Sequence, residues 1–540
     1  MRQPLALLRP RRSSRLALLT GAVVVVAALV ATSVSTPTEA TSRQRPFPID
    51  LERATIPELN EALNAQRITS VQLVEAYLER IRALNSNGPG LNAVRVLAKD
   101  AVDQARVADQ DRRKGRTRGP MHGIPVLVKD NIDVKGLPTT AGALALADSR
   151  PGKDAFLVTR LRTAGAIILG KTNLTEFANF TTNGMPSGYS GLGGQVLNPY
   201  DVSQTPSGSS SGSGAAAAAA LAAVTIGTET SGSILSPSAA NSLVGVKPTV
   251  GLVSRTGVVP IAASQDTAGP MTRSVYDAAA LLTALTGIDR EDPITSTSSG
   301  VVGTDYTRAL STTALQGKRI GVASAPTGNQ GVLFNEALDV IRAQGAEVVP
   351  VTVSTGGLPP GILDYEFKRD LNAYLARLPQ NAPMDTLDDV VQYNLAHAAE
   401  GTIKFGQTQL VTSNSIDLTD PVAKAAYETN RDTGIAGARD RIDSVLRAQT
   451  LDAIVFVGSG SAGIGARAQY PSVAVPIGYD PANGRPVGLS FLGTAYTEAS
   501  LLALAYDYEQ ASKKWLPPSQ VNPSLFRCSP LEGHSPGCAP

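Results

Sequence analysis

Residues 205–239 read TPSGSSSGSGAAAAAALAAVTIGTETSGSILSPSA and carry the clearest structural signal in the chain. A Gly/Ser loop over 207–214 leads directly into an Ala-rich segment, which predicts a helix over Ser213–Ala223. Val224–Thr228 follows with the β-branched residues typical of a strand, and a second small-residue turn covers 227–234. A loop, a helix, a strand and a turn in this order indicate one unit of an α/β fold.

The two Ser/Gly segments also suggest a chemistry. A serine loop at a helix N-terminus offers unpaired N–H groups and a dipole that favours negative charge. The turn over 227–234 can present the Ser233 hydroxyl beside several backbone N–H groups. A nucleophile and an oxyanion hole within one turn are what acyl transfer requires. Considered alone, the first segment is also explained as a Gly/Ser linker, and Ser233 as an ordinary serine of a turn. The acyl-transfer hypothesis therefore also needs a residue that can act as the base.

Lys129 is the candidate base. It ends the apolar segment Gly123–Lys129, which has the length and composition of a strand. Burial at a strand end disfavours a charged amine and lowers its pKa from about 10.4, and a neutral amine accepts protons. Taken alone, an exposed lysine at the end of a strand is the simpler interpretation.

Strand and helix patterns alternate along the rest of the chain, which predicts an α/β layered fold. The region 363–447 is mostly helical in pattern and is expected to form a cap over the sheet. The expected helices are 56–84, 100–114 and 156–163, and the expected strands are 124–129, 166–169, 319–322, 347–353 and 453–457.

The composition restricts the chemistry further. The chain has 540 residues with 3 His and 2 Cys, so a four-thiolate zinc site is excluded and a His-dependent hydrolase is difficult to build. Aromatic residues make up 5%, too few for a platform that stacks nucleic-acid bases. The two cysteines, Cys528 and Cys538, lie together near the C-terminus and are a candidate disulfide.

The first 40 residues have the pattern of a secretory signal peptide: a basic start, an apolar run over Leu16–Ala31 and a small residue, Ala40. A retained membrane anchor is the alternative. The segment contains five Arg and one acid, so its removal changes the formal net charge from +2 to −2. We therefore expect a secreted protein with no nucleic-acid partner and no stable membrane partner after cleavage.

Two segments match the sequence patterns of known motifs, but their predicted secondary structure differs from the one that each motif requires. GAIILGKT (165–172) matches a P-loop, but its variable positions are themselves a predicted strand. GSSSG (208–212) matches the nucleophile elbow of α/β-hydrolases, although no strand precedes it. An esterase that uses Ser210 with His397 or His534 remains an alternative.

Taken together, these segments resemble the amidase signature family of serine hydrolases over about residues 55–510, and the run GLVSRTGVVPIAASQDTAGPM (251–271) is most similar to bacterial peptide amidases. The matching stretches, in the family's order, are GIPVLVKDN (123–131), GKTNLTEFAN (170–179), TPSGSSSGSGAA (205–216), GTETSGSILSPSA (227–239), GVKPTVGLVSRTGVVP (245–260), QDTAGP (265–270), YPSVAVP (470–476) and RPVG (485–488).

The resemblance implies a site. Lys129 matches the base of the family, Ser209 its bridging cis-serine and Ser233 its nucleophile. Ser210 matches a serine that helps to orient the lysine. The family requires neither a metal nor a cofactor. The expected oxyanion hole consists of the backbone N–H groups of Thr230, Ser231, Gly232 and Ser233.

The resemblance also implies one large α/β domain over 41–515, with a central mixed sheet flanked by helices and a variable substrate-side region over 289–450, followed by a Pro-rich tail over 516–540. The expected activity is hydrolysis of a peptide C-terminal amide or another linear amide to a carboxylate and ammonia or an amine. A catalytically silent binding protein on the same scaffold is the alternative from another class. A transamidation subunit is disfavoured by the export signal and the charge of the mature chain. The sequence does not indicate an oligomeric state.

Overall fold

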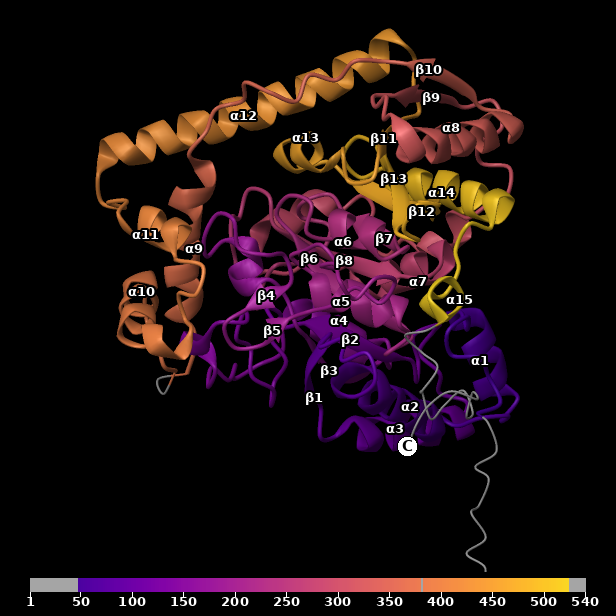
Figure 1. Cartoon of the computed structure of the whole chain (residues 1–540), viewed down its shortest axis with the longest axis horizontal. Coiled ribbons are helices and arrows are strands. Elements are labelled where there is room, and N and C mark those ends of the chain that lie inside the picture. Colours follow the sequence, from indigo (N-terminus) through magenta and orange to yellow (C-terminus); the bar gives the residue numbers. More distant parts are fainter. Residues whose placement is uncertain (1–46, 380–381, 524–540) are drawn as a thin grey trace, which may run out of the picture. The chain divides into compact units, whose positions relative to one another are not determined.

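The computed structural model describes residues 47–379 and 382–523, and its centre is an 11-stranded mixed sheet (Figure 1). The strands follow the order β1-β3-β2-β6-β8-β7-β12-β13-β11-β9-β10, and β4 and β5 form a separate two-stranded sheet. The strands are β1 Val94–Leu97, β2 Pro125–Lys129, β3 Ile167–Thr172, β4 Tyr189–Ser190, β5 Gly194–Gln195, β6 Val224–Glu229, β7 Val244–Lys247, β8 Thr267–Thr272, β9 Arg319–Val322, β10 Glu347–Pro350, β11 Ala453–Val457, β12 Ser472–Tyr479 and β13 Pro486–Leu492.

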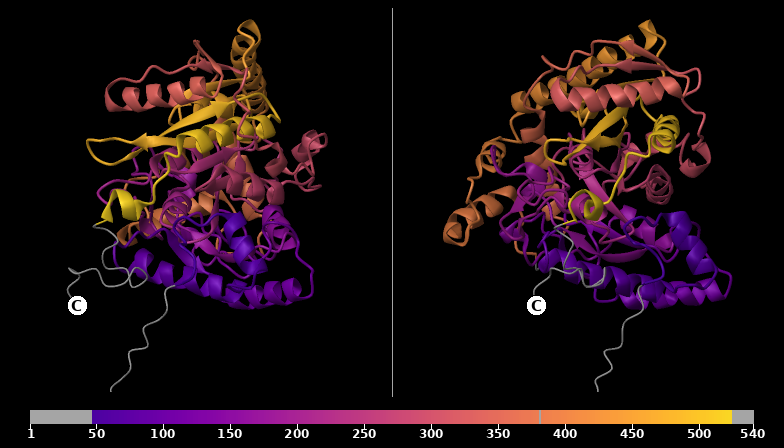
Figure 2. Two further views of the ribbon diagram at one scale, coloured as in Figure 1. Left: turned by 90° about the vertical axis from the view of Figure 1, so that its right-hand side faces the viewer. Right: turned by 45° about the vertical axis from the view of Figure 1, so that its right-hand side comes forward.

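Helices cover both faces of this sheet (Figure 2). Successive side chains of β12 point to opposite faces of the sheet, and both faces are apolar. Val473 and Val475 belong to the same hydrophobic cluster as α14, whereas Ala474 packs with α6 and α13 on the opposite face. The predicted α/β fold is therefore confirmed. The helices are α1 Ile56–Asn64, α2 Ser70–Ile81, α3 Ala101–Arg113, α4 Phe156–Thr163, α5 Ser211–Ala218, α6 Leu235–Ala240, α7 Val275–Leu285, α8 Gly328–Ala343, α9 Ile362–Leu375, α10 Leu387–Ala396, α11 Thr408–Asn414, α12 Pro421–Ala448, α13 Ala462–Arg467, α14 Glu498–Ser512 and α15 Pro518–Val521.

Strand pairing brings the catalytic candidates to one edge of the sheet. β2 pairs in parallel with β3 on one side and with β6 on the other, with Val128 opposite Ile226. The C-terminal ends of β2 and β6 therefore lie side by side, and they carry Lys129 and Glu229. β8 runs antiparallel to β6 and pairs Thr267 with Glu229, so the residues just before β8 reach the same edge.

The Ala-rich helix is shorter than its sequence predicts, and it begins earlier. α5 spans Ser211–Ala218, and the chain then leaves the helix because Ala220 adopts a left-handed φ of 52°. Two glycines lie inside the helix although glycine is a poor helix former. A Cβ atom at Gly212 would lie 2.4 Å from the carbonyl oxygens of Ala93 and Asn173, so close packing requires glycine there.

The region 363–447, predicted to be mostly helical, packs beside the loops that contain Phe177 and Ile261. Side chains of α9, α10 and α11, among them Phe367, Leu387 and Leu410, share one hydrophobic cluster with Phe177 and Ile261. The first part of the region 289–450 has a different place, because β9, α8 and β10 extend the far edge of the sheet. Within the described ranges, the helices that pack beside these loops therefore come only from the part of 289–450 that follows β10.

Two predicted features lie outside the described residues, namely the signal peptide over 1–40 and the pair Cys528 and Cys538. Both remain predictions. Within residues 47–379 and 382–523, no helix has the length and apolar character that crossing a membrane requires.

Candidate active site

The Lys129 side chain is fully buried and forms a three-way contact at the end of β2. Its Nζ atom lies 2.9 Å from Ser209 Oγ, 2.9 Å from Thr228 Oγ1 and 3.3 Å from the Thr228 carbonyl oxygen. Asn131 Nδ2 donates a second hydrogen bond to Thr228 Oγ1 at 3.0 Å. Thr228 thus fixes the Lys129 amine on two sides and leaves its third direction for Ser209.

Burial lowers the pKa of Lys129 from 10.5 to about 7, because the charged form loses its hydration. The negative charges of Asp266 and Glu229 act in the opposite direction and raise this pKa. A lysine in this position exchanges a proton near neutral pH. A neutral amine can donate its two hydrogens to Thr228 and accept the hydrogen of the Ser209 hydroxyl.

The serine loop brings Ser209 to this lysine. The Gly208–Ser209 peptide bond is cis, and Ser209 and Ser210 are both fully buried. The Ser210 hydroxyl donates to the Thr228 carbonyl oxygen at 3.0 Å and accepts from the Thr228 N–H at 3.1 Å. Ser210 thus reaches Lys129 only through Thr228, because it contacts the backbone of Thr228 and Thr228 contacts the lysine. That Ser210 helps to orient Lys129 stays a prediction.

Ser233 lies in the turn between β6 and α6 and retains 7% of its exposure. Its carbonyl oxygen accepts a hydrogen bond from the Ser210 N–H at 3.1 Å, which joins the nucleophile turn to the serine loop. Its hydroxyl makes no hydrogen bond within the part of the chain that the structure describes. This hydroxyl is therefore available to a bound molecule.

The backbone N–H groups of this turn do not all point to the same acceptor. Gly232 donates to Glu229 Oε1 at 2.7 Å, so the expectation that Gly232 contributes to an oxyanion hole needs correction. The N–H groups of Thr230, Ser231 and Ser233 have no acceptor among the described residues. Three of the four predicted donors are thus available beside Ser233.

Asp266 borders the turn from the segment before β8. Its Oδ1 atom accepts from the Thr230 hydroxyl at 2.6 Å, and its Oδ2 atom accepts from the N–H groups of Ile261 and Ala262 at 2.8 and 2.9 Å. Burial nevertheless raises the pKa of Asp266 to about 7. This carboxyl therefore connects the turn to the loop that packs against α9.

Sequence reasoning missed three residues of this arrangement: Thr228, Glu229 and Asp266. Thr228 and Glu229 stand at the end of a predicted strand, where a polar residue is ordinary. One signal was present, because Glu229 is the single acid in a turn rich in unpaired N–H groups, which attract a carboxylate. The role of Asp266 depends on the pairing of β6 with β8, which a single sequence does not reveal.

The alternative motifs have other structural roles. Lys171 of the P-loop match is buried and pairs with Asp130 Oδ1 at 3.2 Å, and residues Ile167–Thr172 of this match form strand β3 instead of a phosphate-binding loop. His397 contacts the carbonyl oxygen of Tyr393, and no histidine of the described ranges contacts Ser210, although His534 lies outside them. Those ranges also contain no group of three or more His, Cys, Asp or Glu side chains that could hold a metal ion.

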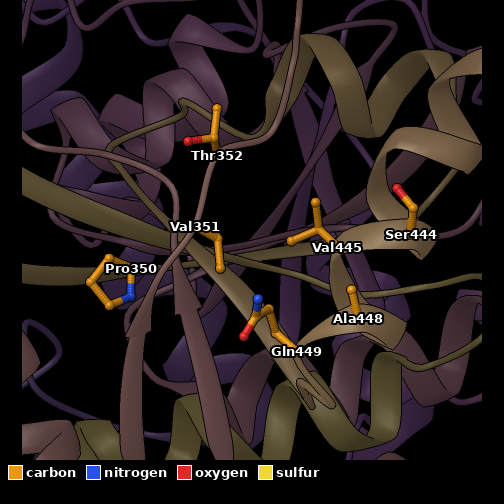
Figure 3. A pocket seen from close by; sticks show the side chains of 7 residues that line it. All are labelled: Pro350, Val351, Thr352, Ser444, Val445, Ala448 and Gln449. Atoms are coloured by element: carbon orange, nitrogen blue, oxygen red, sulfur yellow. The ribbon is translucent and has the colours of Figure 1, made fainter.

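A depression of about 500 Å³ lies elsewhere, between β10 and the last turns of α12 (Figure 3). None of its lining side chains is titratable, and none belongs to the site described above. It therefore offers no base or nucleophile. The lining residues are Pro350, Val351, Thr352, Ser444, Val445, Ala448 and Gln449.

The chain is similar to known proteins over most of its length. Residues 72–456 match the family described as Amidase. The native peptide amidase of Stenotrophomonas maltophilia has 45% sequence identity and a TM-score of 0.80, with 88% of this chain and 99% of that chain covered. An amidase family protein of Bacillus anthracis has 37% identity and a TM-score of 0.83, with 87% and 92% covered. A protein of Arabidopsis thaliana named "Probable amidase" is 42% identical over 485 residues, which cover 87% of this chain and 92% of the relative.

Proposed function

This chain belongs to the amidase family, and we propose that it hydrolyses its substrate through an acyl-enzyme on Ser233, with Ser209 and Lys129 relaying the proton. That it is an amidase, a hydrolase of C–N amide bonds, rests on the family match and on relatives that cover most of the chain. The observation that carries the proposed mechanism is the 2.9 Å contact between the buried Lys129 amine and the Ser209 hydroxyl.

The contact of Lys129 with Ser209 supports the proposed proton relay. The neutral amine accepts a proton from Ser209, and Ser209 accepts one from Ser233 as the Ser233 oxygen attacks the amide carbonyl. The negative oxygen of the tetrahedral intermediate accepts hydrogen bonds from the N–H groups of Thr230, Ser231 and Ser233. Each such donor lowers the barrier by about 3 kcal/mol in comparable sites. The proton then returns through Ser209 to the leaving nitrogen, and water cleaves the acyl-enzyme by the same relay.

We propose a peptide C-terminal amide, or another linear amide, as the substrate. The support is the similarity to a protein named peptide amidase, which covers 99% of that chain. The product pair is then a carboxylate and ammonia or a small amine. The test is a panel of peptide amides, fatty amides and anilides given to purified residues 41–540, with ammonia and amine release measured. Release from peptide amides supports the first class, release from fatty amides or anilides alone identifies another linear amide as the substrate, and release from none of them contradicts the proposal.

The mechanism has its own test. Ser233→Ala and Lys129→Ala should each remove nearly all hydrolysis, since the first lacks the nucleophile and the second the base. Ser210→Ala is the discriminating control, because an esterase of the α/β-hydrolase type would lose its nucleophile there. Full activity in Lys129→Ala at pH 7–8 would refute the lysine mechanism. A wild-type chain that binds amides and cleaves none would instead favour a binding protein.

We further propose that the chain is exported and loses residues 1–40. The basic start, the apolar run and Ala40 support this. Production of the full chain in a bacterial host with an intact export system, followed by the intact mass of the protein in each fraction, is the test. The proposal predicts a protein outside the cytoplasm that begins near residue 41. Full-length protein held in the membrane would indicate the anchor instead.

A further inference from the structure

Glu229 is a buried carboxylate that the proposed proton relay does not use. Its side chain is 1% exposed, and it ends β6 four positions before Ser233. Oε1 accepts the Gly232 N–H at 2.7 Å, and Oε2 accepts the N–H groups of Ile234 and Leu235 at 2.7 and 2.9 Å. Three charge-assisted hydrogen bonds therefore converge on one side chain from the turn that carries the nucleophile.

The Glu229 carboxylate has no cation close to it in the part of the chain that the structure describes. Among the described residues, none places a Lys, Arg or His nitrogen within 4.0 Å of Glu229 in an ion pair, unlike Asp130, which pairs with Lys171 and Arg95. A buried carboxylate without an ion pair is costly unless hydrogen bonds satisfy it. The backbone of the turn supplies those bonds. The turn and the carboxylate therefore stabilise one another, and the loss of either leaves buried polar groups without partners.

The contacts of Glu229 divide the N–H groups of the turn into two sets. Gly232 reaches the carboxylate in a left-handed conformation with a φ of 87°, and Ile234 and Leu235 follow at the start of α6. The N–H groups of Thr230, Ser231 and Ser233 have no acceptor within residues 47–379 and 382–523. Because the two sets alternate in one short turn, a change in the first set reorients the second.

We propose that Glu229 is a positioning residue for amide hydrolysis, because its carboxylate holds the turn that presents Ser233 and the free N–H groups, and its charge acts on Lys129. This inference rests on the proposed acyl-enzyme mechanism. Glu229 itself touches no reacting atom. It acts through the backbone it binds and through the field that it adds to the site.

The charge of Glu229 also affects the pKa values of the two buried lysines near it. Burial lowers the pKa of Lys129 on β2 and of Lys247 on β7, and the charge of Glu229 on β6 opposes that lowering at both lysines. Asp266, before β8, acts on Lys129 in the same direction, and Glu498 of α14 acts on Lys247. Removal of the Glu229 charge should therefore lower the pKa of Lys129, while Asp266 keeps part of the effect.

The test compares Glu229→Gln with the wild-type enzyme on an amide that the wild type cleaves. The glutamine amide has a single acceptor oxygen, so it cannot replace both carboxylate oxygens. We expect kcat to fall by about 100-fold or more, in the range of a lost oxyanion donor, with KM changed by less than about 3-fold. The acidic limb of the kcat/KM profile should move to lower pH. Glu229→Asp keeps the charge and should leave that limb near its wild-type position.

Asp277→Asn is the matched control. Asp277 is also a carboxylate that is 1% exposed and accepts a backbone N–H, that of Ile56 at 2.8 Å, but it belongs to α7 and not to the site. This variant should lose stability without a change in kcat or in the pH limb. A Glu229→Gln enzyme that folds and keeps the wild-type kcat overturns the proposal. A slow Glu229→Gln enzyme with an unmoved pH limb also overturns it, because the role is then merely structural.

Hydrogen exchange keeps the inference separate from the proposed function. Peptides over 230–236 should exchange at least about 10-fold faster in Glu229→Gln than in the wild type, while peptides of α1 should not change. If the wild-type chain cleaves no amide, the proposed function fails, and exchange alone decides whether Glu229 holds the turn. Unchanged protection of this segment in Glu229→Gln overturns the inference in either case.

Discussion

The Nζ atom of Lys129 lies 2.9 Å from the Oγ atom of Ser209, although the two residues stand 80 positions apart in the chain. β2 delivers the lysine at its buried C-terminal end, and the loop before α5 delivers the serine. Both side chains are fully buried, so water does not compete for the contact. The direction of this hydrogen bond follows the protonation state of Lys129, since an ammonium group only donates and a neutral amine can accept.

The pH dependence of hydrolysis follows from that direction. The pKa of Lys129 lies at about 7, and the base must be neutral when Ser233 attacks. We expect kcat/KM to be constant well above pH 7 and to fall about tenfold per pH unit below it. Initial rates on one amide between pH 5 and 9 measure this limb. A rate that stays unchanged down to pH 5 would show that no group with this pKa acts as the base.

Asp266 provides a check on the assignment of that limb, because burial also raises its pKa to about 7. If Lys129 is the titrating base, Asp266→Asn should keep the limb and move it to lower pH, since the charge of Asp266 raises the pKa of Lys129. If Asp266 itself is the group that titrates, the limb should vanish in this variant. The same rate measurement separates the two outcomes.

The stability of the wild type relative to Lys129→Met should depend on pH in a defined way. The pKa of Lys129 is about 7 in the folded protein and 10.5 without perturbation, so the unfolded chain binds more protons between these values. The free energy of unfolding of the wild type therefore rises relative to the variant from pH 7 to about 10, and the difference is constant below pH 7. Thermal unfolding of both proteins at matched pH values measures it, and a difference that is flat across pH 7–10 would contradict a depressed pKa.

Part of this site could be predicted from the sequence because its signals are local. Lys129 ends an apolar strand pattern, and Ser209 and Ser233 stand in Ser/Gly turns next to predicted elements. The contacts that complete the site are not local. Thr228 meets Lys129 because β2 and β6 are neighbours in the sheet, and Asp266 meets Thr230 because β8 runs antiparallel to β6. Strand order depends on the packing of the whole chain.

The fold shows the same division between local and distant causes. The expected helix over 156–163 is confirmed as α4, with bounds that the apolar spacing already indicated. The expected helix over 213–223 is wrong at both ends. Alanine favours a helix throughout that run, but the chain must turn at Ala220 to enter β6, and Gly212 is accepted because Ala93 and Asn173 leave no room for a side chain. Tertiary packing overrides helix propensity here.

Thr228→Val tests the residue that holds the lysine. The variant has the same shape but loses the acceptor for the bonds from Lys129 and Asn131, so two buried donors lose a partner. We expect kcat to fall by about 10- to 100-fold, and the pH limb to move to lower pH because the ammonium form loses one acceptor. Thr225→Val is the control on the same strand, since Thr225 donates to the carbonyl oxygens of Ser213 and Met271 instead. An equal loss of kcat in both variants would mean that packing of β6, not the contact with Lys129, causes the effect.

Gly232→Ala tests whether the conformation of the nucleophile turn limits the rate. Gly232 has a φ of 87°, which an L-residue with a side chain rarely adopts, and a Cβ atom there would lie 3.0 Å from Ser236 Oγ. We expect a loss of about 1–2 kcal/mol in stability and a larger loss in kcat, because strain shifts the N–H groups beside Ser233. Gly463→Ala is the control: it lies in α13 with nothing within 4 Å of the added atom, and should be stabilised by about 0.5–1 kcal/mol at unchanged kcat. Chemical denaturation and initial rates measure both, and a Gly232→Ala enzyme that loses stability but keeps its full kcat would show that the turn can relax without moving the site.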